Sequence, residues 1–237
     1  MGDRHPADPP DTSRRQLATV ELLGALTYGQ LRGVEAVSRL IALAPEVEAA
    51  VAAVDDVERE LTAYRRLHAH LRRRTDLDAA VMQRQRGVLD DYFDEAPTST
   101  WFDACVFLAV GAPIAADFAH AVAGHLDAPD AEAVREAFEH RAAVEASAVA
   151  RLTGLLDDDA ARARAARLTA DVLGAALTNF QSAMAASDAL TVLLAQDATA
   201  TTERRVKDLA IELLTAHRRR TVALGIEDVE DVEDEES

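Results

Sequence analysis

Apolar residues recur at three- and four-residue spacing through long stretches of this 237-residue chain, and no stretch sustains the alternation of a half-buried strand. Aromatic residues make up only 4% of the chain, although 49% is apolar and alanine is very abundant. Such a composition suits closely packed helices, and the β-branched clusters that strands need are scarce. The sequence therefore predicts an all-α protein with a sizeable core.

Turn and cap signals divide the chain into long helices. Pro45 separates the first two helices, and the run from Asp127 to Asp130 separates two later ones. The helices are expected at about 11–44, 45–74, 76–93, 101–126, 130–156, 159–196 and 202–224. This order describes two antiparallel helix pairs joined by a long connection, with further helices at the C-terminal end.

We expect one domain at residues 13–225, with a loose, proline-containing leader at 1–12 and an acidic disordered tail at 226–237. The formal net charge is −17, and the tail from Glu227 onward holds eight acidic residues and no basic one, so the body carries −9. An acidic body lacks the cationic surface that neutralises phosphates, so we expect no nucleic-acid partner.

Membrane insertion and disulfide bonding are both disfavoured. The longest stretch without a charged or polar side chain, Ala104 to Ala116, is shorter than the roughly 20 residues that span a bilayer. Cys105 is the only cysteine, so the chain forms no internal disulfide. With no apolar signal segment at the start, the sequence predicts a cytoplasmic protein.

Polar residues interrupt the apolar stripe of each main helix. Glu35, Glu60 and Asp117 share helix faces with apolar neighbours, and His140 lies on a less clearly apolar face. In an antiparallel pair, two residues meet when the turn lies midway between them. The midpoint of Asp117 and His140 falls at 128 to 129, and that of Glu35 and Glu60 at 47 to 48. We therefore expect these four side chains to point inward at similar heights.

Several segments resemble the tRNA-hydroxylase-like branch of the ferritin-like proteins, which is common in actinobacteria. The segments are VELLGALTYGQ at 20–30 followed by Glu35, IAADF at 114–118, DALT at 188–191, and LTAHRR at 214–219 with Leu224 and Gly225. The resemblance covers about 20–225 and implies a ferritin-like four-helix bundle with additional C-terminal helices. It also implies a non-haem di-iron centre and oxygen-dependent hydroxylation of a modified tRNA base.

Ferritin-like di-metal centres take a carboxylate from each of two helices and a Glu-x-x-His pair from each of the other two. By resemblance, Glu35, Glu60 and Asp117 match the acids of the first three helices. Ala63 stands where the histidine paired with Glu60 belongs. On the fourth helix, His140 with Ala143 or Glu139 with Ala142 matches the pattern, and both choices leave alanine at the histidine position.

His120 follows Asp117 by three residues and is a candidate substitute for the missing imidazole. The metal candidates are thus Glu35, Glu60, Asp117, His140 and His120.

Two functions remain open on the sequence alone. The favoured one is a non-catalytic bundle with an incomplete or altered metal site, which needs no cofactor and acts as a homodimer or through a protein partner. The alternative is a non-haem di-iron oxygenase or oxidase related to tRNA hydroxylases, with iron as its cofactor.

Overall fold

The computed structural model describes residues 11–195 and 201–226, all as helices and short connections with no strand among them. The all-α prediction is confirmed. The predicted leader and acidic tail fall mostly outside the described residues and stay predictions. The elements are α1 (Asp11–Leu43), α2 (Val47–Arg74), α3 (Asp78–Asp94), α4 (Trp101–Val106), the π-helical segment η1 (Phe107–Gly111), α5 (Ala112–Ala123), α6 (Ala128–Phe138), α7 (Arg141–Thr153), α8 (Asp159–Ala186), α9 (Ala189–Leu194) and α10 (Thr202–Leu224).

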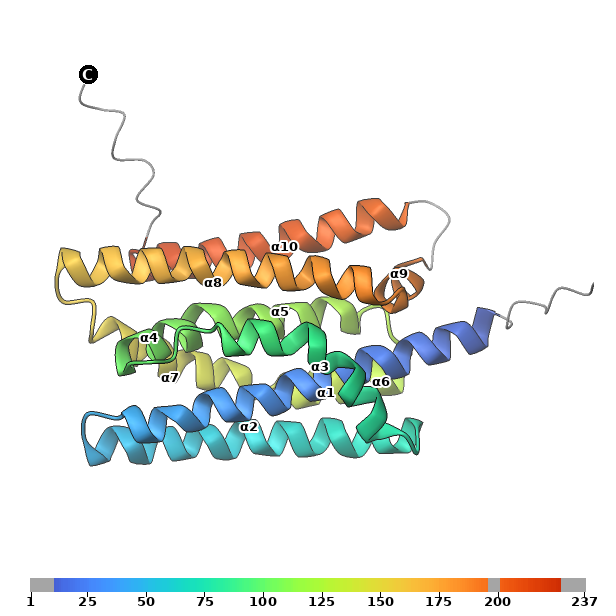
Figure 1. The fold of residues 1–237 in the computed structure, drawn as a ribbon, viewed down its shortest axis with the longest axis horizontal. Helices are drawn as coiled ribbons and strands as arrows, with labels where there is room; N and C mark the ends of the chain where they lie inside the picture. Colours follow the sequence, from blue (N-terminus) through green and yellow to red (C-terminus); the bar gives the residue numbers. More distant parts are fainter. Residues whose placement is uncertain (1–10, 196–200, 227–237) are drawn as a thin grey trace, which may run out of the picture.

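The helices lie roughly along one axis in three layers (Figure 1). The α1–α2 hairpin forms one outer layer, and α8 with α10 forms the other. The middle layer holds α3, α4, η1 and α5, with α6 and α7 behind them. Helix α1 packs against α2, α3 and α9, while α5 packs against α6 and α10. A site in the middle of the molecule therefore receives side chains from helices far apart in sequence.

Three helix ends illustrate local capping chemistry. The hydroxyl groups of Thr100 and Thr201 accept hydrogen bonds from backbone amides in the first turns of α4 and α10, at 3.2 and 3.3 Å. Gly225 ends α10 in the left-handed conformation, with φ at 63°, as a glycine after a helix commonly does. The predicted bounds of the first two helices and of the last helix are confirmed.

Two predicted helices are interrupted. The expected helix from 130 to 156 is split into α6 and α7 at Glu139 and His140. The His140 carbonyl group accepts hydrogen bonds from Ala143 and Val144, at 3.0 and 3.3 Å, and so begins a new helix. The expected helix from 159 to 196 breaks at Ser187, whose backbone is extended. The buried stripe continues through this break, from Val134 and Ala137 of α6 to Arg141 of α7.

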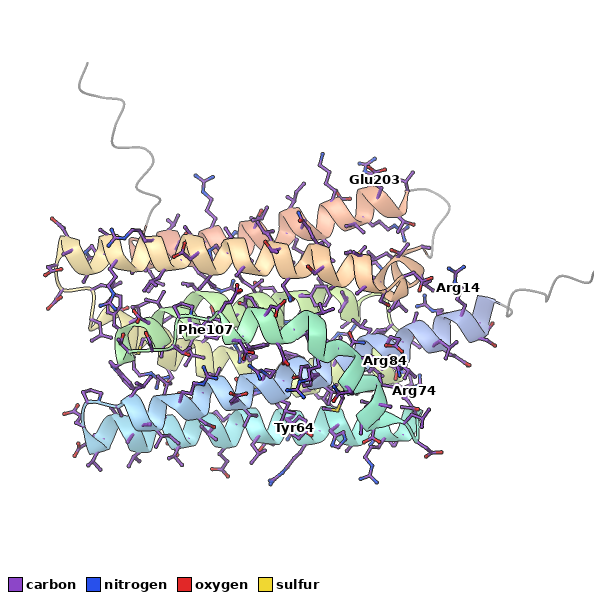
Figure 2. All side chains as sticks on the ribbon, in the orientation of Figure 1. Arg14, Tyr64, Arg74, Arg84, Phe107 and Glu203 are labelled. Carbon is purple, nitrogen blue, oxygen red and sulfur yellow. The ribbon has the colours of Figure 1, made fainter. Side chains whose placement is uncertain are left out.

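The stretch Trp101–Ala123 crosses the centre of the molecule. Residues 104–110 are each at most 2% exposed, and Phe107 lies in the middle layer (Figure 2). By length and composition this is the one described helical stretch that could cross a membrane, and 61% of its most apolar window is buried inside the protein. Its apolar character is that of a core helix covered by the other layers.

Candidate functional site

Glu60 lies on α2 with no exposed surface, in the interior of the bundle. Its carboxylate accepts a hydrogen bond from Nη1 of Arg141 at one oxygen and from Nε2 of Gln30 at the other. The Nε2 atom of His140 lies 3.6 Å from the second oxygen. The predicted inward orientation of Glu60 is confirmed, and its partners come from α1, α7 and the turn before α7.

The charges around Glu60 keep its carboxylate ionised. Burial alone would raise the pKa of Glu60, because an ionised group is poorly solvated in the interior. The Arg141 guanidinium, and then the His140 imidazole, act in the opposite direction and hold the pKa of Glu60 below its ordinary value. Glu60 and Arg141 therefore form a buried, hydrogen-bonded ion pair.

Arg141 lies directly after the break between α6 and α7. Arg141 is the first residue of α7, and it continues the buried stripe of Val144, Ala148 and Leu152. The prediction that His140 is the inward residue of this segment is therefore only partly right. His140 lies near Glu60, but the hydrogen-bonded partner is Arg141.

The alanines that match histidines of the resembling family lie in different surroundings. Ala63 is buried in the core, at 2% exposure, as expected for a position beside Glu60. Ala142 and Ala143 are exposed. A histidine at either of these α7 positions would lie on the outer face of the helix, so the two alanine positions are not equivalent in this fold.

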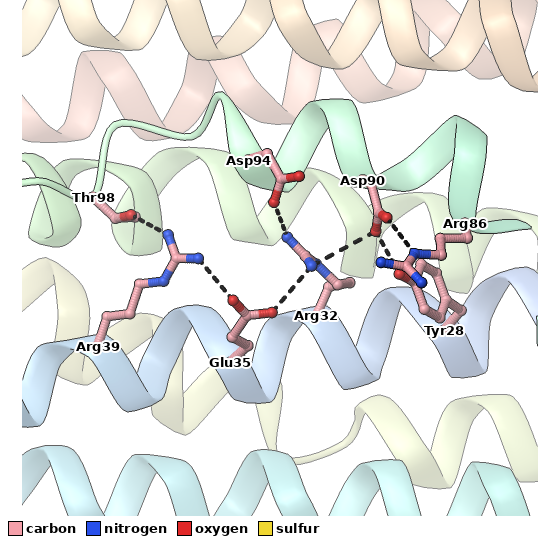
Figure 3. A network of polar contacts seen from close by, with 8 residues as sticks. All are labelled: Tyr28, Arg32, Glu35, Arg39, Arg86, Asp90, Asp94 and Thr98. Atoms are coloured by element: carbon pink, nitrogen blue, oxygen red, sulfur yellow. Dashed lines mark hydrogen bonds and ion pairs between the residues drawn. The ribbon is translucent and has the colours of Figure 1, made fainter. Parts of the chain in front are cut away.

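The prediction that Glu35 points inward is wrong. Its side chain is 48% exposed and pairs with Arg39 at 2.7 Å and with Arg32 at 3.1 Å (Figure 3). Arg32 also reaches Asp90 and Asp94 on α3, so these contacts belong to a network that fastens α1 to α3. The buried face of α1 instead carries Leu23, Leu26, Gln30, Val37 and Leu40.

Helix register explains why Gln30, and not Glu35, meets Glu60. Helix α1 ends at Leu43 and α2 begins at Val47, so the centre of the hairpin is Pro45. The midpoint of Gln30 and Glu60 is also 45. The pairing of Glu35 with Glu60 assumed a turn two to three residues later than the one that forms.

Asp117 and His120 lie on α5, away from Glu60's partners. Asp117 accepts two hydrogen bonds from Nη2 of Arg220 on α10, at 2.8 and 2.7 Å. Arg220 also donates to Glu145 on α7 at 2.7 Å. His120 is exposed, and its ring packs edge-on against Phe138 with centroids 6.2 Å apart. Of the five predicted ligands, the structure thus brings together only Glu60 and His140.

The donor set around Glu60 does not fit a di-iron centre. In residues 11–195 and 201–226, no group of three or more His, Cys, Asp or Glu side chains is placed to hold a metal ion. A di-iron site needs several carboxylates and imidazoles, whereas Glu60 faces an amide group and a guanidinium cation. The Arg141 guanidinium supplies the positive charge that a metal would otherwise bring to Glu60.

Other buried carboxylates show the same arrangement. Asp56 is fully buried and bonds to Arg59 at 2.9 Å and to Arg151 at 2.7 Å. Asp130 is also fully buried. It lies 2.6 Å from Nε2 of His70 and accepts a hydrogen bond from Nε of Arg74 at 2.8 Å. Arginine is therefore the general counter-ion for buried acids in this bundle.

Sequence reasoning missed Gln30 and Arg141, although both leave a signal. Gln30 stands in the apolar stripe of Leu23, Leu26 and Val37, where a polar residue needs a buried partner. Arg141 lies three residues before Val144, on the same apolar stripe. A search for arginines on buried stripes, in addition to acids and histidines, would have made Arg141 a candidate.

Comparison with known proteins agrees with this fold. The family model described as "Ferritin-like domain, actinomycetes" matches residues 13–197. The chain belongs to this family, and the prediction of a ferritin-like bundle is confirmed. No curated protein matches the sequence. The family match covers the α1–α2 hairpin and the segments that hold Glu60, Asp117 and Arg141.

We predict that the Glu60–Arg141 pair is strongly coupled. Arg141→Met should lower the free energy of unfolding by about 3 to 5 kcal/mol, because it leaves a buried carboxylate without a counter-ion. Adding Glu60→Leu should recover most of that loss. Urea unfolding of both variants measures the coupling. Arg204→Ala, in an exposed pair, is the control and should change the free energy by under about 0.5 kcal/mol. Additive losses in the double variant would contradict the prediction.

We also predict that Glu60 makes the protein acid-sensitive. A carboxyl group whose folded pKa is lowered stabilises the fold above its unfolded pKa, and this stability is lost as pH falls through the folded pKa. Below about pH 4.3 the free energy of unfolding should therefore fall with pH. Glu60→Gln should reduce that slope by up to about 1.4 kcal/mol per pH unit.

Urea unfolding between pH 3 and 6 measures the slope, and Glu58→Gln on the exposed face of α2 is the control. Equal slopes for the wild type and Glu60→Gln would show that Glu60 does not carry this pH dependence.

Proposed function

We propose that this protein is a metal-independent, non-catalytic ferritin-like bundle that works by binding. The observation that carries the proposal is the Arg141 guanidinium on Glu60. In the ferritin-like arrangement the metals are held by inward carboxylates, and here the inward carboxylate of α2 is neutralised by a side chain.

The other two acids support the same proposal. Glu35 is on the outer face of α1 with two arginines, and Asp117 is bound by Arg220. Each of the three acids that resemble metal ligands thus has an arginine partner of its own. Binding an iron pair would require these ion pairs to separate. It would also require Glu35 to turn from one face of α1 to another. An oxygen-activating enzyme is therefore the less favoured function.

The alternative remains a di-iron oxygenase or oxidase related to tRNA hydroxylases. One observation favours it: Nε2 of His140 is buried near Glu60 and has no hydrogen-bond partner in the part of the chain that the structure describes. Imidazole nitrogens and carboxylate oxygens are both common metal ligands. Two ligands fall short of the set that a di-iron centre uses.

The proposal includes the setting in which the protein acts. We expect it to be cytoplasmic and to act as a homodimer or with a protein partner. We do not expect it to bind nucleic acid, because the body of the chain is acidic.

Metal content tests the proposed function. The protein is expressed in medium supplemented with iron and manganese, purified without chelator, and measured for metal per chain. A di-iron protein of the same fold, prepared in parallel, is the positive control. We expect far less than one metal ion per chain, and the same amount in Glu60→Ala. One or two ions per chain that are lost in Glu60→Ala would overturn the proposal.

A gain-of-function variant sharpens this test. Ala63→His combined with Arg141→Ala supplies a buried imidazole one helical turn from Glu60 and removes the competing cation. We expect this variant to bind more metal than the wild type. Metal content equal to the wild type would show that Arg141 is not what keeps metal from Glu60.

A further inference from the structure

A cavity of about 220 Å³ lies between the α1–α2 hairpin and the outer layer of α8 and α10. A water molecule needs only about 10 to 15 Å³ of such space, and a dry apolar cavity of about 150 Å³ binds benzene. The cavity therefore has room for a one-ring molecule with a small substituent. Its walls are mostly apolar, with one side chain from each of five helices as examples: Leu26, Leu89, Phe118, Phe180 and Leu213.

One part of the wall is polar, and it belongs to the Glu60 site. Gln30, Glu60, Tyr92 and Arg141 all line the cavity. Tyr92 is 9% exposed and Arg141 is 7% exposed, so more than nine-tenths of each residue is buried. The apolar space and the buried ion pair are therefore parts of one site.

Two hydrogen-bond donors at this polar part lack an acceptor. Within residues 11–195 and 201–226, the Tyr92 hydroxyl group and Nε of Arg141 have no hydrogen-bond partner. A guanidinium group has five N–H donors, and the bond to Glu60 from Nη1 is the one that the described residues give to Arg141. Leaving buried donors unpaired is costly, so a bound acceptor atom would be stabilised here.

The charges define which acceptor suits the site. Glu60 already neutralises Arg141, so an anionic ligand would bring a second negative charge to one guanidinium. Burial raises the pKa of Tyr92, which keeps its hydroxyl group a neutral donor at physiological pH. An uncharged oxygen that only accepts hydrogen bonds, such as a carbonyl oxygen, leaves the charges balanced and satisfies the donors.

The cavity also reaches the surface. Its lining includes Glu21, Gln85 and Ser187, which are half-buried polar residues of α1, α3 and the turn after α8. These residues place one end of the cavity at the surface, between α1, α3 and the turn after α8.

We propose that this cavity binds a small, uncharged, mostly apolar molecule with one carbonyl oxygen, and that this oxygen accepts hydrogen bonds from Arg141 and Tyr92. The inference rests on the proposed function, because a metal ion on Glu60 would displace Arg141. It goes beyond that function by naming the site and the chemical class of the ligand.

Three probes of similar size test the proposal on full-length protein treated with chelator. Acetophenone carries the carbonyl oxygen, ethylbenzene replaces it with hydrocarbon, and benzoate replaces it with a carboxylate. Titration followed by amide chemical shifts gives a dissociation constant for each probe. We expect saturable binding of acetophenone, with ethylbenzene and benzoate each roughly threefold to tenfold weaker.

Tyr92→Phe is the matched variant, and Tyr64→Phe on α2, outside the cavity lining, is its control. Tyr92→Phe should weaken acetophenone roughly threefold and leave ethylbenzene unchanged, while Tyr64→Phe should change neither. Because the Tyr92 hydroxyl group has no partner in the fold, Tyr92→Phe should unfold at the same temperature as the wild type or a higher one.

Several results would overturn the inference: no saturable binding of acetophenone, ethylbenzene or benzoate binding as tightly as acetophenone, or equal affinities in the wild type and Tyr92→Phe. Metal content is measured before the chelator treatment. This measurement tests the proposed function separately from the cavity proposal. Stoichiometric metal would sink the proposed function, whereas metal-free protein that binds no ketone would sink only the cavity proposal.

Discussion

A fully buried carboxylate between packed helices is stable only with a counter-charge, and Glu60 sets this requirement at the centre of the bundle. Removing an ion from water costs several kcal/mol even after the protein relaxes, so the ion needs a close partner and hydrogen bonds. Arg141 supplies the charge and Gln30 a second hydrogen bond. Through the Glu60 carboxylate, α2 is thus joined to α7 by Arg141 and to α1 by Gln30.

The same electrostatic solution recurs along the bundle and joins other helices. Asp56 on α2 is bound by Arg151 on α7, and Asp117 on α5 is bound by Arg220 on α10. A metal centre joins helices by sharing ligands, whereas here each acid has a guanidinium group with planar, directional donors. The bundle can therefore keep inward or half-buried acids without a metal. Its central space remains partly open, as the cavity beside Glu60 shows.

The fold was predictable because helical periodicity, prolines and the final glycine are local signals. The site was predictable only in part. Glu60 lies on a long amphipathic helix with a clear apolar stripe, so its inward orientation followed from the sequence. Helix α1 has apolar residues on several faces, including Leu31 and Ile41, which are 37% and 39% exposed. The buried face of α1 was therefore predicted wrongly, and with it the orientation of Glu35.

The helix break just before Arg141 is marked by no proline or glycine. Glu139 and His140 are ordinary helix residues, so the sequence favoured one continuous helix from the Asp127–Asp130 turn. Arg141 lies on the buried stripe that α6 and α7 share, and its bond to Glu60 on α2 is a tertiary contact. Tertiary contacts of this kind cannot be inferred from one sequence, which is why the ion pair at the centre of the site was missed.

The central claim is that a guanidinium group takes the place of metal beside Glu60. The most direct measurement is anomalous diffraction at the iron edge from crystals of the full-length protein grown after incubation with excess ferrous iron. We expect no anomalous peak at Glu60 and a hydrogen bond between Arg141 and the Glu60 carboxylate. An iron peak at bonding distance from Glu60, with Arg141 turned away, would contradict it.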